Sequence, residues 1–205
     1  MKQPSTYYHA KTCTKKIQVH QGGTRSGKTW SLLNVLIELC YQNENAQMVI
    51  TIARKTYPAL RASVMRDFYT ILNDEGIYNQ SHHNKSDGTY ILYGNLIEFI
   101  SVDQPQKVRG RKRDILFVNE CNEISREDWR QLLLRTTYKT FIDYNPSDEY
   151  HWIYDDVLER DDVAFFKTTY LDNPFLEQNI IDEIERYKET DENYWRIYGL
   201  GERGV

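Results

Sequence analysis

Short, mostly apolar runs alternate with segments of helical spacing along the chain. Because these runs show no regular polar alternation, we expect strands that are buried on both faces, as in a parallel sheet. The helical segments between them complete a β-α alternation. The sequence therefore predicts an α/β fold with a mainly parallel central sheet flanked by helices. The five predicted strands are Lys16–His20, Met48–Ala53, Ile115–Val118, Thr140–Tyr144 and Val163–Lys167.

The segments between these strands carry helix and hairpin signals. In Trp30–Tyr41 the polar residues follow one narrow stripe, which indicates a helix that is mostly buried. Tyr90–Ile100 contains Gly94-Asn95 between two β-rich runs, which predicts a hairpin turn at those two residues. Further helices are predicted over Ala59–Leu72, over Ser125–Thr137 with Ser125 as the N-cap, and over Ile180–Tyr187.

Residues 22–29, called the phosphate loop below, match the pattern G-x-x-x-x-G-K-[ST] in full. The loop lies between a predicted strand and a predicted helix, which is the context that phosphate binding requires. Its glycines allow backbone N–H groups to surround an anion, and the helix dipole adds to the attraction. We expect Lys28 to reach the β- and γ-phosphates of ATP and the Thr29 hydroxyl to bind Mg²⁺. The residues expected to contact the nucleotide are Gly22, Gly23, Thr24, Arg25, Ser26, Gly27, Lys28 and Thr29.

Asn119 and Glu120, called the second motif below, directly follow the predicted strand Ile115–Val118. Ligands of doubly wound sheets bind at the carboxyl ends of strands. P-loop proteins usually carry an aspartate at the position of Asn119, where it helps to hold Mg²⁺ in its second shell. Asparagine keeps the oxygen acceptor but loses the charge. We expect Glu120 to act as the general base that activates water, with Glu123 as a rival for this role.

Lys28 and Asn119 are 91 positions apart (119 − 28), which leaves room for a further βα unit and the hairpin. An additional strand between the phosphate-loop strand and the second-motif strand is typical of ATPases with a catalytic glutamate. We therefore expect a P-loop NTPase of this additional-strand type. Residues 1–150 are assigned to the ATPase core, and residues 151–205 to a lid or linker region that completes the domain.

The composition limits the partners that the chain can have. Its 205 residues carry a formal net charge of −4, so any contact with nucleic acid has to come from local basic patches. The densest patch is Lys107–Arg113, which is either a solvated face or such a contact. The three cysteines have no CxxC spacing, which disfavours a disulfide framework or a zinc site. No apolar run approaches the roughly 18 residues of a membrane span, so no membrane partner is expected.

Several short motifs occur in a fixed order and together resemble the ATPase domain of phage large terminases, the motors that package DNA. The resemblance covers roughly residues 15–203, and its order and spacing are more specific than any motif after the phosphate loop. The motifs are Arg25 within the loop, Ala53-Arg54-Lys55-Thr56, Val108-Arg109-Gly110, Phe117-Val118-Asn119-Glu120, Tyr144-Asn145-Pro146 and Asp172-Asn173-Pro174-Phe175.

The resemblance implies roles for further residues. Asn145 matches the coupling motif, which senses the γ-phosphate, although Asn145-Pro146 can also simply end a strand. Arg109 would act on the ATP of a neighbouring subunit and Arg25 within its own subunit, while exposed surface is the alternative for both. The basic side chains after the second strand would contact DNA phosphate or remain ordinary surface charges. These residues are Arg54, Lys55, Arg61 and Arg66.

The resemblance also implies partners and a location. These are double-stranded DNA, the portal protein, the small terminase subunit and further copies of the chain in a pentameric ring when active. In isolation, a monomer is an alternative to the ring. The location would be the cytoplasm of an infected bacterial host, at the procapsid portal. Large terminases carry a nuclease domain after the ATPase domain, and we expect none here because the sequence stops near its start. An excised domain and a truncated gene both fit this end.

Two other functions fit the same motifs. A helicase-like or repair ATPase would share the P-loop core. An inactive module that binds nucleotide and serves assembly is favoured by Asn119, which lacks the usual charge. Strand separation would distinguish the helicase, and unchanged phosphate release after substitution of Glu120 would distinguish the inactive module.

Overall fold

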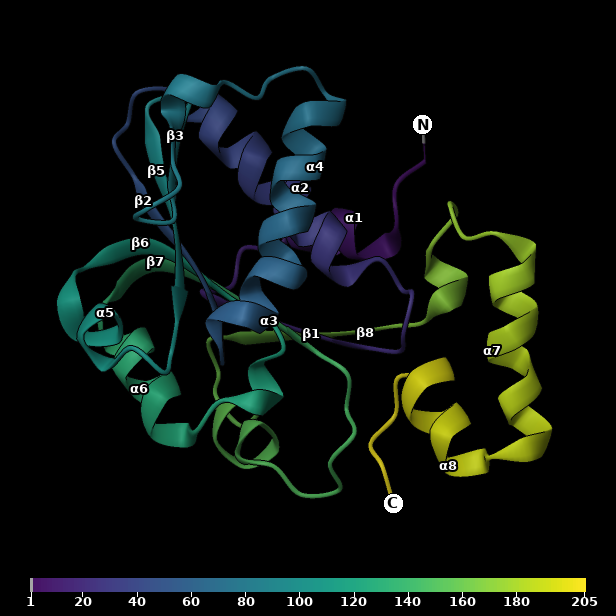
Figure 1. Cartoon of the computed structure of the whole chain (residues 1–205). Coiled ribbons are helices and arrows are strands. Elements are labelled where there is room, and N and C mark those ends of the chain that lie inside the picture. Colours follow the sequence, from purple (N-terminus) through teal and green to yellow (C-terminus); the bar gives the residue numbers. More distant parts are fainter. Residues whose placement is uncertain (1) are drawn as a thin grey trace. The chain divides into compact units, whose positions relative to one another are not determined.

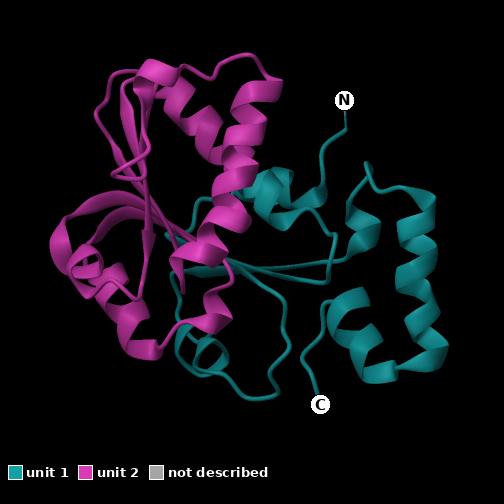
Figure 2. Ribbon diagram, viewed as in Figure 1, with its two compact units in different colours: residues 1–32, 142–205 teal, residues 33–141 magenta. Residues whose placement is uncertain are grey.

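The computed structural model describes residues 2–205 (Figure 1). The chain divides into two compact units (Figure 2). Unit 1 joins the N-terminal residues up to Leu32 with Ile142–Val205, and unit 2 is Leu33–Phe141. The helix α2 (Lys28–Gln42) and the strand β7 (Thr136–Tyr144) run from one unit into the other.

Unit 2 is built on a parallel set of strands with an antiparallel edge. The strand β2 (Val49–Arg54) pairs in parallel with β5 (Asn95–Ser101) and with β6 (Arg113–Val118). Ile52 stands opposite Phe99 on one side and Phe117 on the other, and all three are buried. The short strands β4 (Thr89–Leu92) and β3 (His83–Asn84) extend the sheet in antiparallel order. The other elements of unit 2 are α3 (Tyr57–Ala62), α4 (Val64–Asp74), η1 (Gln80–His82), α5 (Pro105–Gly110), η2 (Cys121–Glu123) and α6 (Arg126–Leu134).

Unit 1 is built on the parallel pair β1 (Ile17–Gly22) and β8 (Val163–Thr168), which carry its central part. Every residue of β1 is buried. At the C-terminal end, α7 (Gln178–Thr190) lies beside α8 (Glu192–Tyr194) and η5 (Trp195–Gly199), in yellow-green and yellow in Figure 1. The other elements are α1 (Ser5–Thr12), η3 (Ile153–Val157) and η4 (Tyr170–Asp172).

All five predicted strands are present, with ends that differ by a few residues. Within residues 2–205 the sheet has eight strands in the order β3-β4-β5-β2-β6-β7-β1-β8. In this order β7 is the additional strand between β6 and β1. The expected fold class, a P-loop type α/β fold with a mainly parallel sheet and flanking helices, is confirmed. The division at residue 150 stays a prediction.

Two local predictions were wrong in detail. The single helix expected over 59–72 is broken at Ser63, whose backbone is not helical (φ −130°, ψ −95°). The Ser63 hydroxyl bonds to the Ala59 carbonyl and accepts a bond from Arg54, which holds the break in place. The hairpin turns at Tyr93-Gly94 rather than Gly94-Asn95, and both turn residues have positive φ. Asn95 instead begins β5, and its buried side chain bonds to the carbonyls of Cys40 and Asn43.

Two other features concern the N-terminal cap of α6 and the length of the helices. Ser125 caps α6 as predicted, because its hydroxyl accepts a bond from the Asp128 amide. The helix ends at Leu134 and not at the predicted Thr137, because β7 already begins at Thr136. Within residues 2–205, no helix combines the length and apolar character that a membrane span requires.

Candidate active site

The phosphate loop connects β1 to α2, as predicted. Two glycines at its start are required by close backbone approach. A Cβ on Gly22 would lie 2.7 Å from the Thr168 carbonyl oxygen, and one on Gly23 would lie 2.4 Å from the Tyr198 carbonyl oxygen. Gly27 has φ +83°, a left-handed conformation that favours glycine. Larger residues at these positions would displace the loop.

The C-terminal part of unit 1 holds the phosphate loop through backbone groups. The Gly23 amide donates to the Thr168 carbonyl at 3.0 Å, and the Thr24 amide donates to the Tyr198 carbonyl at 2.8 Å. The Gln21 side chain donates to the Gly201 carbonyl at 2.8 Å. A shift of this segment would therefore break or displace hydrogen bonds at the start of the loop.

Lys28 lies inside the loop and is only 8% exposed. Its ammonium group donates to the carbonyls of Gly22 and Gly23, at 3.2 and 3.1 Å, and to the Ser26 hydroxyl at 3.3 Å. It also donates to Asn145 Oδ1 at 3.1 Å. The two residues expected to face the γ-phosphate are thus in direct contact with each other.

Thr29 contacts a carboxylate that the sequence pattern did not single out. Its hydroxyl donates to Asp143 Oδ2 at 2.6 Å, and Asp143 is 1% exposed. A hydroxyl next to a carboxylate is an oxygen-rich environment of the kind that Mg²⁺ prefers, so these residues fit the expected ion. The sign in the sequence that could have pointed to Asp143 is an acidic residue inside the apolar run of β7.

Arg25 is exposed and has φ +60°, which is uncommon for a residue with a side chain. Its carbonyl accepts a bond from the Asn173 side chain at 3.0 Å. Asn173 belongs to the Asp-Asn-Pro-Phe motif, so this motif contacts the phosphate loop. The strained backbone of Arg25 is therefore held by the C-terminal part of unit 1.

His20 on β1 is buried close to Lys28. Burial, followed by the charges of His9 and Lys28, lowers the pKa of His20 to about 3. The imidazole is therefore neutral near pH 7. It lies 3.0 Å from Gln18 Oε1 and stacks on the Phe166 ring of β8. A neutral ring lets the loop keep Lys28 as its buried cation without a second charge beside it.

The second motif lies in unit 2, at the carboxyl end of β6. Asn119 is buried, and its amide donates to the Ala53 carbonyl at the end of β2. Glu120 follows with φ 51° and ψ 54°, a left-handed backbone that costs a residue with a side chain about 1–2 kcal/mol. Such outliers concentrate at functional sites, where the surrounding structure maintains them.

Glu123, the rival for the role of general base, is part of an ion pair. Its two carboxylate oxygens each lie 3.3 Å from a guanidinium nitrogen of Arg54. Arg54 also bonds to Ser63 and to the Ala59 carbonyl. These contacts give Glu123 and Arg54 a structural role in joining β2, α3 and η2.

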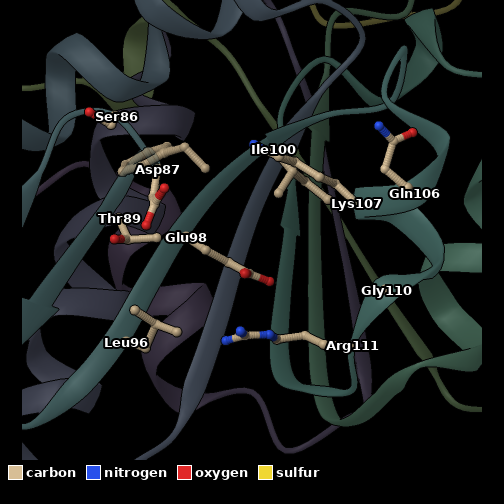
Figure 3. A pocket seen from close by; sticks show the side chains of 11 residues that line it. Ser86, Asp87, Thr89, Leu96, Glu98, Ile100, Gln106, Lys107, Gly110 and Arg111 are labelled. Carbon is tan, nitrogen blue, oxygen red and sulfur yellow. The ribbon is translucent and has the colours of Figure 1, made fainter.

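Arg109 lies in the last turn of α5 and is exposed. Beside this helix is a cavity of about 550 Å³ (Figure 3). Figure 3 shows Asp87 and Glu98 on the β4–β5 side of the cavity and Lys107 and Arg111 on the α5 side. The cavity therefore carries both signs of charge.

A second depression of unit 2, about 610 Å³ in volume, carries mainly positive charge. Four basic side chains line it without a carboxylate among the lining residues, and we call it the cationic groove. Its basic residues are Arg61, Arg66, Lys85 and Lys107, and its other lining residues are Tyr57, Met65, Tyr69, His83, Ser86, Gly88 and Gln104.

The predicted site residues are thus distributed over both units. Unit 1 holds residues 22–29 and Asn145, and the structure brings Lys28 together with Asn145. Unit 2 holds Asn119, Glu120 and Arg109. Asp143 is a carboxylate at the phosphate loop that the sequence pattern did not reveal.

Solved structures with a similar fold include large terminases. The large terminase from a thermophilic bacteriophage has a TM-score of 0.81 and 21% sequence identity, over 98% of this chain and 53% of that chain. The same protein in complex with ATP-gamma-S has a TM-score of 0.80 and 21% identity, over 98% and 52%. The large terminase ATPase domain of Thermus phage P74-26 has a TM-score of 0.67 and 14% identity, over 98% and 94%.

Sequence comparison points the same way. The PBSX phage terminase large subunit of Bacillus subtilis (strain 168) is 21% identical over 214 residues, which are 90% of this chain and 48% of that protein. This chain thus spans about half the length of that curated relative. The Terminase_3 family, described as the phage terminase large subunit, matches residues 14–202. Because this match extends over nearly the whole chain, the chain belongs to the phage terminase large subunit family.

Proposed function

We propose that this chain is the ATPase domain of a motor that uses ATP hydrolysis to move double-stranded DNA into a procapsid. The observation that carries the proposal is the constellation at the phosphate loop, where Lys28 contacts Asn145 and Thr29 contacts Asp143. Membership in the terminase family supports the motor role. The DNA, the portal protein, the small terminase subunit and a pentameric ring in the infected cell are parts of this proposal.

Hydrolysis at this site would need one proton acceptor and several groups that neutralise phosphate charge. We assign the acceptor role to Glu120. The oxygen of a water molecule bonds to the γ-phosphorus, the bond from that phosphorus to the β–γ bridging oxygen breaks, and the proton of the water passes to Glu120. ADP and phosphate are the products. Lys28 and the loop amides would stabilise the charge on the phosphate oxygens.

Magnesium, when bound, would neutralise charge on the β- and γ-phosphates. Thr29 would hold it directly and Asn119 would act from its second shell. Asn145 would couple turnover to movement, because its amide oxygen shares the Lys28 ammonium with the loop carbonyls. When Lys28 turns to a γ-phosphate, Asn145 loses that partner and can report nucleotide binding to the chain that follows β7.

The substitution Lys28→Ala tests the proposed function. We expect the wild-type domain to release phosphate from ATP faster with duplex DNA present, and Lys28→Ala to abolish the release, because the loop loses its only predicted lysine contact to phosphate. Phosphate release and binding of a fluorescent ADP analogue measure the two effects. Lys188→Ala on α7 is a control for loss of one positive charge.

Two results would contradict this proposal. Equal turnover in the wild type and in Lys28→Ala would leave no role for the phosphate loop in catalysis. Strand separation of a duplex, measured with a labelled fork, would favour the helicase-like alternative over a packaging motor.

We assign contact with DNA phosphate to the cationic groove. Its four cations line one depression, and the ion pair of Arg66 with Asp67 is long, at 3.7 Å. Arg54, another candidate for this contact, is held more closely by Glu123, at 3.3 Å. Such binding is electrostatic and independent of sequence. It also agrees with the formal net charge of −4, because only a local surface has to be basic.

Replacement of two groove cations should weaken DNA binding and its dependence on salt. For Arg61→Gln with Lys85→Gln, the negative slope of log K against log[salt] should decrease in magnitude by about 2, or about 1 for each lost phosphate contact. The matched control is Arg186→Gln with Lys188→Gln on α7, which removes the same charges elsewhere. Fluorescence anisotropy of a labelled duplex at several salt concentrations measures both slopes. Equal changes in the two double variants would reject the groove as the binding surface.

A further inference from the structure

The Thr29 hydroxyl is hydrogen-bonded to a buried carboxylate. Thr29 Oγ1 donates to Asp143 Oδ2 at 2.6 Å, and the two residues lie 114 positions apart in the sequence. Asp143 is the next-to-last residue of β7, and Lys28 and Asn145 meet close to this pair along the same two segments. The end of β7 and the residue that follows it therefore touch the phosphate loop at two contacts.

The carboxylate of Asp143 is buried, and this burial has an energetic cost. It is 1% exposed, and an ionised carboxyl group with so little contact to water is costly unless hydrogen bonds or cations compensate it. The hydrogen bond from Thr29 is one such compensation. A magnesium ion held by Thr29, when bound, would add to this compensation through its positive charge.

The chemistry of a hydroxyl ligand explains why an acceptor is useful here. A hydroxyl that binds a metal directs a lone pair to the ion and must direct its hydrogen to another acceptor. A carboxylate as that acceptor fixes the orientation of the hydroxyl and strengthens it as a ligand. Asp143 is placed for this role, whereas Asn119 of the second motif carries no charge.

We propose that Asp143 is a positioning residue for Mg²⁺, which acts by orienting the Thr29 hydroxyl and supplies the negative charge that Asn119 lacks. The inference rests on the proposed function, because it assigns a further residue to the same nucleotide site. It also explains how the site can hold the ion although the second motif has asparagine.

The test separates Mg²⁺ binding from nucleotide binding. Affinity for a fluorescent ADP analogue is measured in EDTA and across a Mg²⁺ titration, for the wild type, Asp143→Asn and Asp143→Glu. We expect Asp143→Asn to bind the Mg²⁺-free nucleotide like the wild type but to require about 10–100-fold more Mg²⁺ for the tighter complex. Asp143→Glu should recover part of this loss because it keeps the carboxylate.

A second variant covers a failure of Asp143→Asn to fold. Thr29→Ala should show the same increase in the Mg²⁺ requirement, and the double variant should add little to it, because both residues act through one contact. Additive losses in the double variant, or an unchanged Mg²⁺ requirement in Asp143→Asn, would overturn the inference and leave the proposed function intact. Absence of nucleotide binding by the wild type would overturn the proposed function itself.

Discussion

Replacement of Glu120 by glutamine should lower ATP turnover by about 10²–10⁴-fold while nucleotide binding stays close to that of the wild type. The amide keeps the size of the side chain but cannot accept the proton of the attacking water. The rate constant for a single turnover, measured by rapid mixing with excess protein, isolates the chemical step from product release. Binding of the fluorescent ADP analogue measures the nucleotide site separately.

Glu123→Gln is the matched control for this experiment. It removes an acid three residues away, and its main expected effect is loss of the ion pair with Arg54, which contributes at most about 1 kcal/mol at this partly exposed position. Turnover should therefore change little. A large loss of turnover in Glu123→Gln together with a small one in Glu120→Gln would exchange the two assignments.

The backbone of Glu120 provides a second readout. With φ 51° the residue occupies a conformation in which glycine is more stable than a residue with a side chain. Glu120→Gly should therefore unfold at a temperature equal to or above that of the wild type and still lose turnover. Such a combination indicates that the strained residue is kept for its carboxylate and not for stability.

The parts of this fold that were predictable are those encoded by neighbouring residues. The phosphate loop needs glycines, a lysine and a hydroxyl within eight positions, at the junction of a strand and a helix. In the structure, residues 22–29 run from the last residue of β1 into the first turn of α2. The buried strands could be recognised from their composition for the same reason. The N-cap Ser125 is equally local, since it bonds to an amide three residues away.

The parts that could not be predicted depend on residues far apart in the sequence. Asp143 lies inside the predicted strand Thr140–Tyr144, and its role is hidden in the sequence because its partner Thr29 lies 114 positions away. The C-terminal part of unit 1 contacts the phosphate loop through backbone groups, such as the Tyr198 carbonyl that accepts from the Thr24 amide. Backbone contacts of this kind leave no pattern of side chains in the sequence. The helix α1 has only weak amphipathic spacing, and stacking of its His9 on Phe166 of β8 helps to hold it.

Arg109→Ala should lower turnover by about 10³–10⁵-fold if the side chain acts as an arginine finger on a neighbouring subunit. Its guanidinium is exposed on α5, and within residues 2–205 it has no hydrogen bond or ion pair to another side chain, so it is available to a second copy. A planar guanidinium also matches the charge of a transferring phosphoryl group. Phosphate release at protein concentrations where wild-type activity rises faster than linearly measures the loss in the assembled state.

Mixing two inactive variants distinguishes action across the subunit boundary from action within one subunit. Arg109→Ala retains Glu120, and Glu120→Gln retains Arg109, so a ring that contains both has interfaces with a complete set of groups. We therefore expect the mixture to recover activity that neither variant has alone. Arg25→Ala mixed with Glu120→Gln should stay inactive, because Arg25 belongs to the loop that binds the same nucleotide. Without recovery in the Arg109→Ala mixture, the arginine acts within its own subunit or serves only the surface of α5.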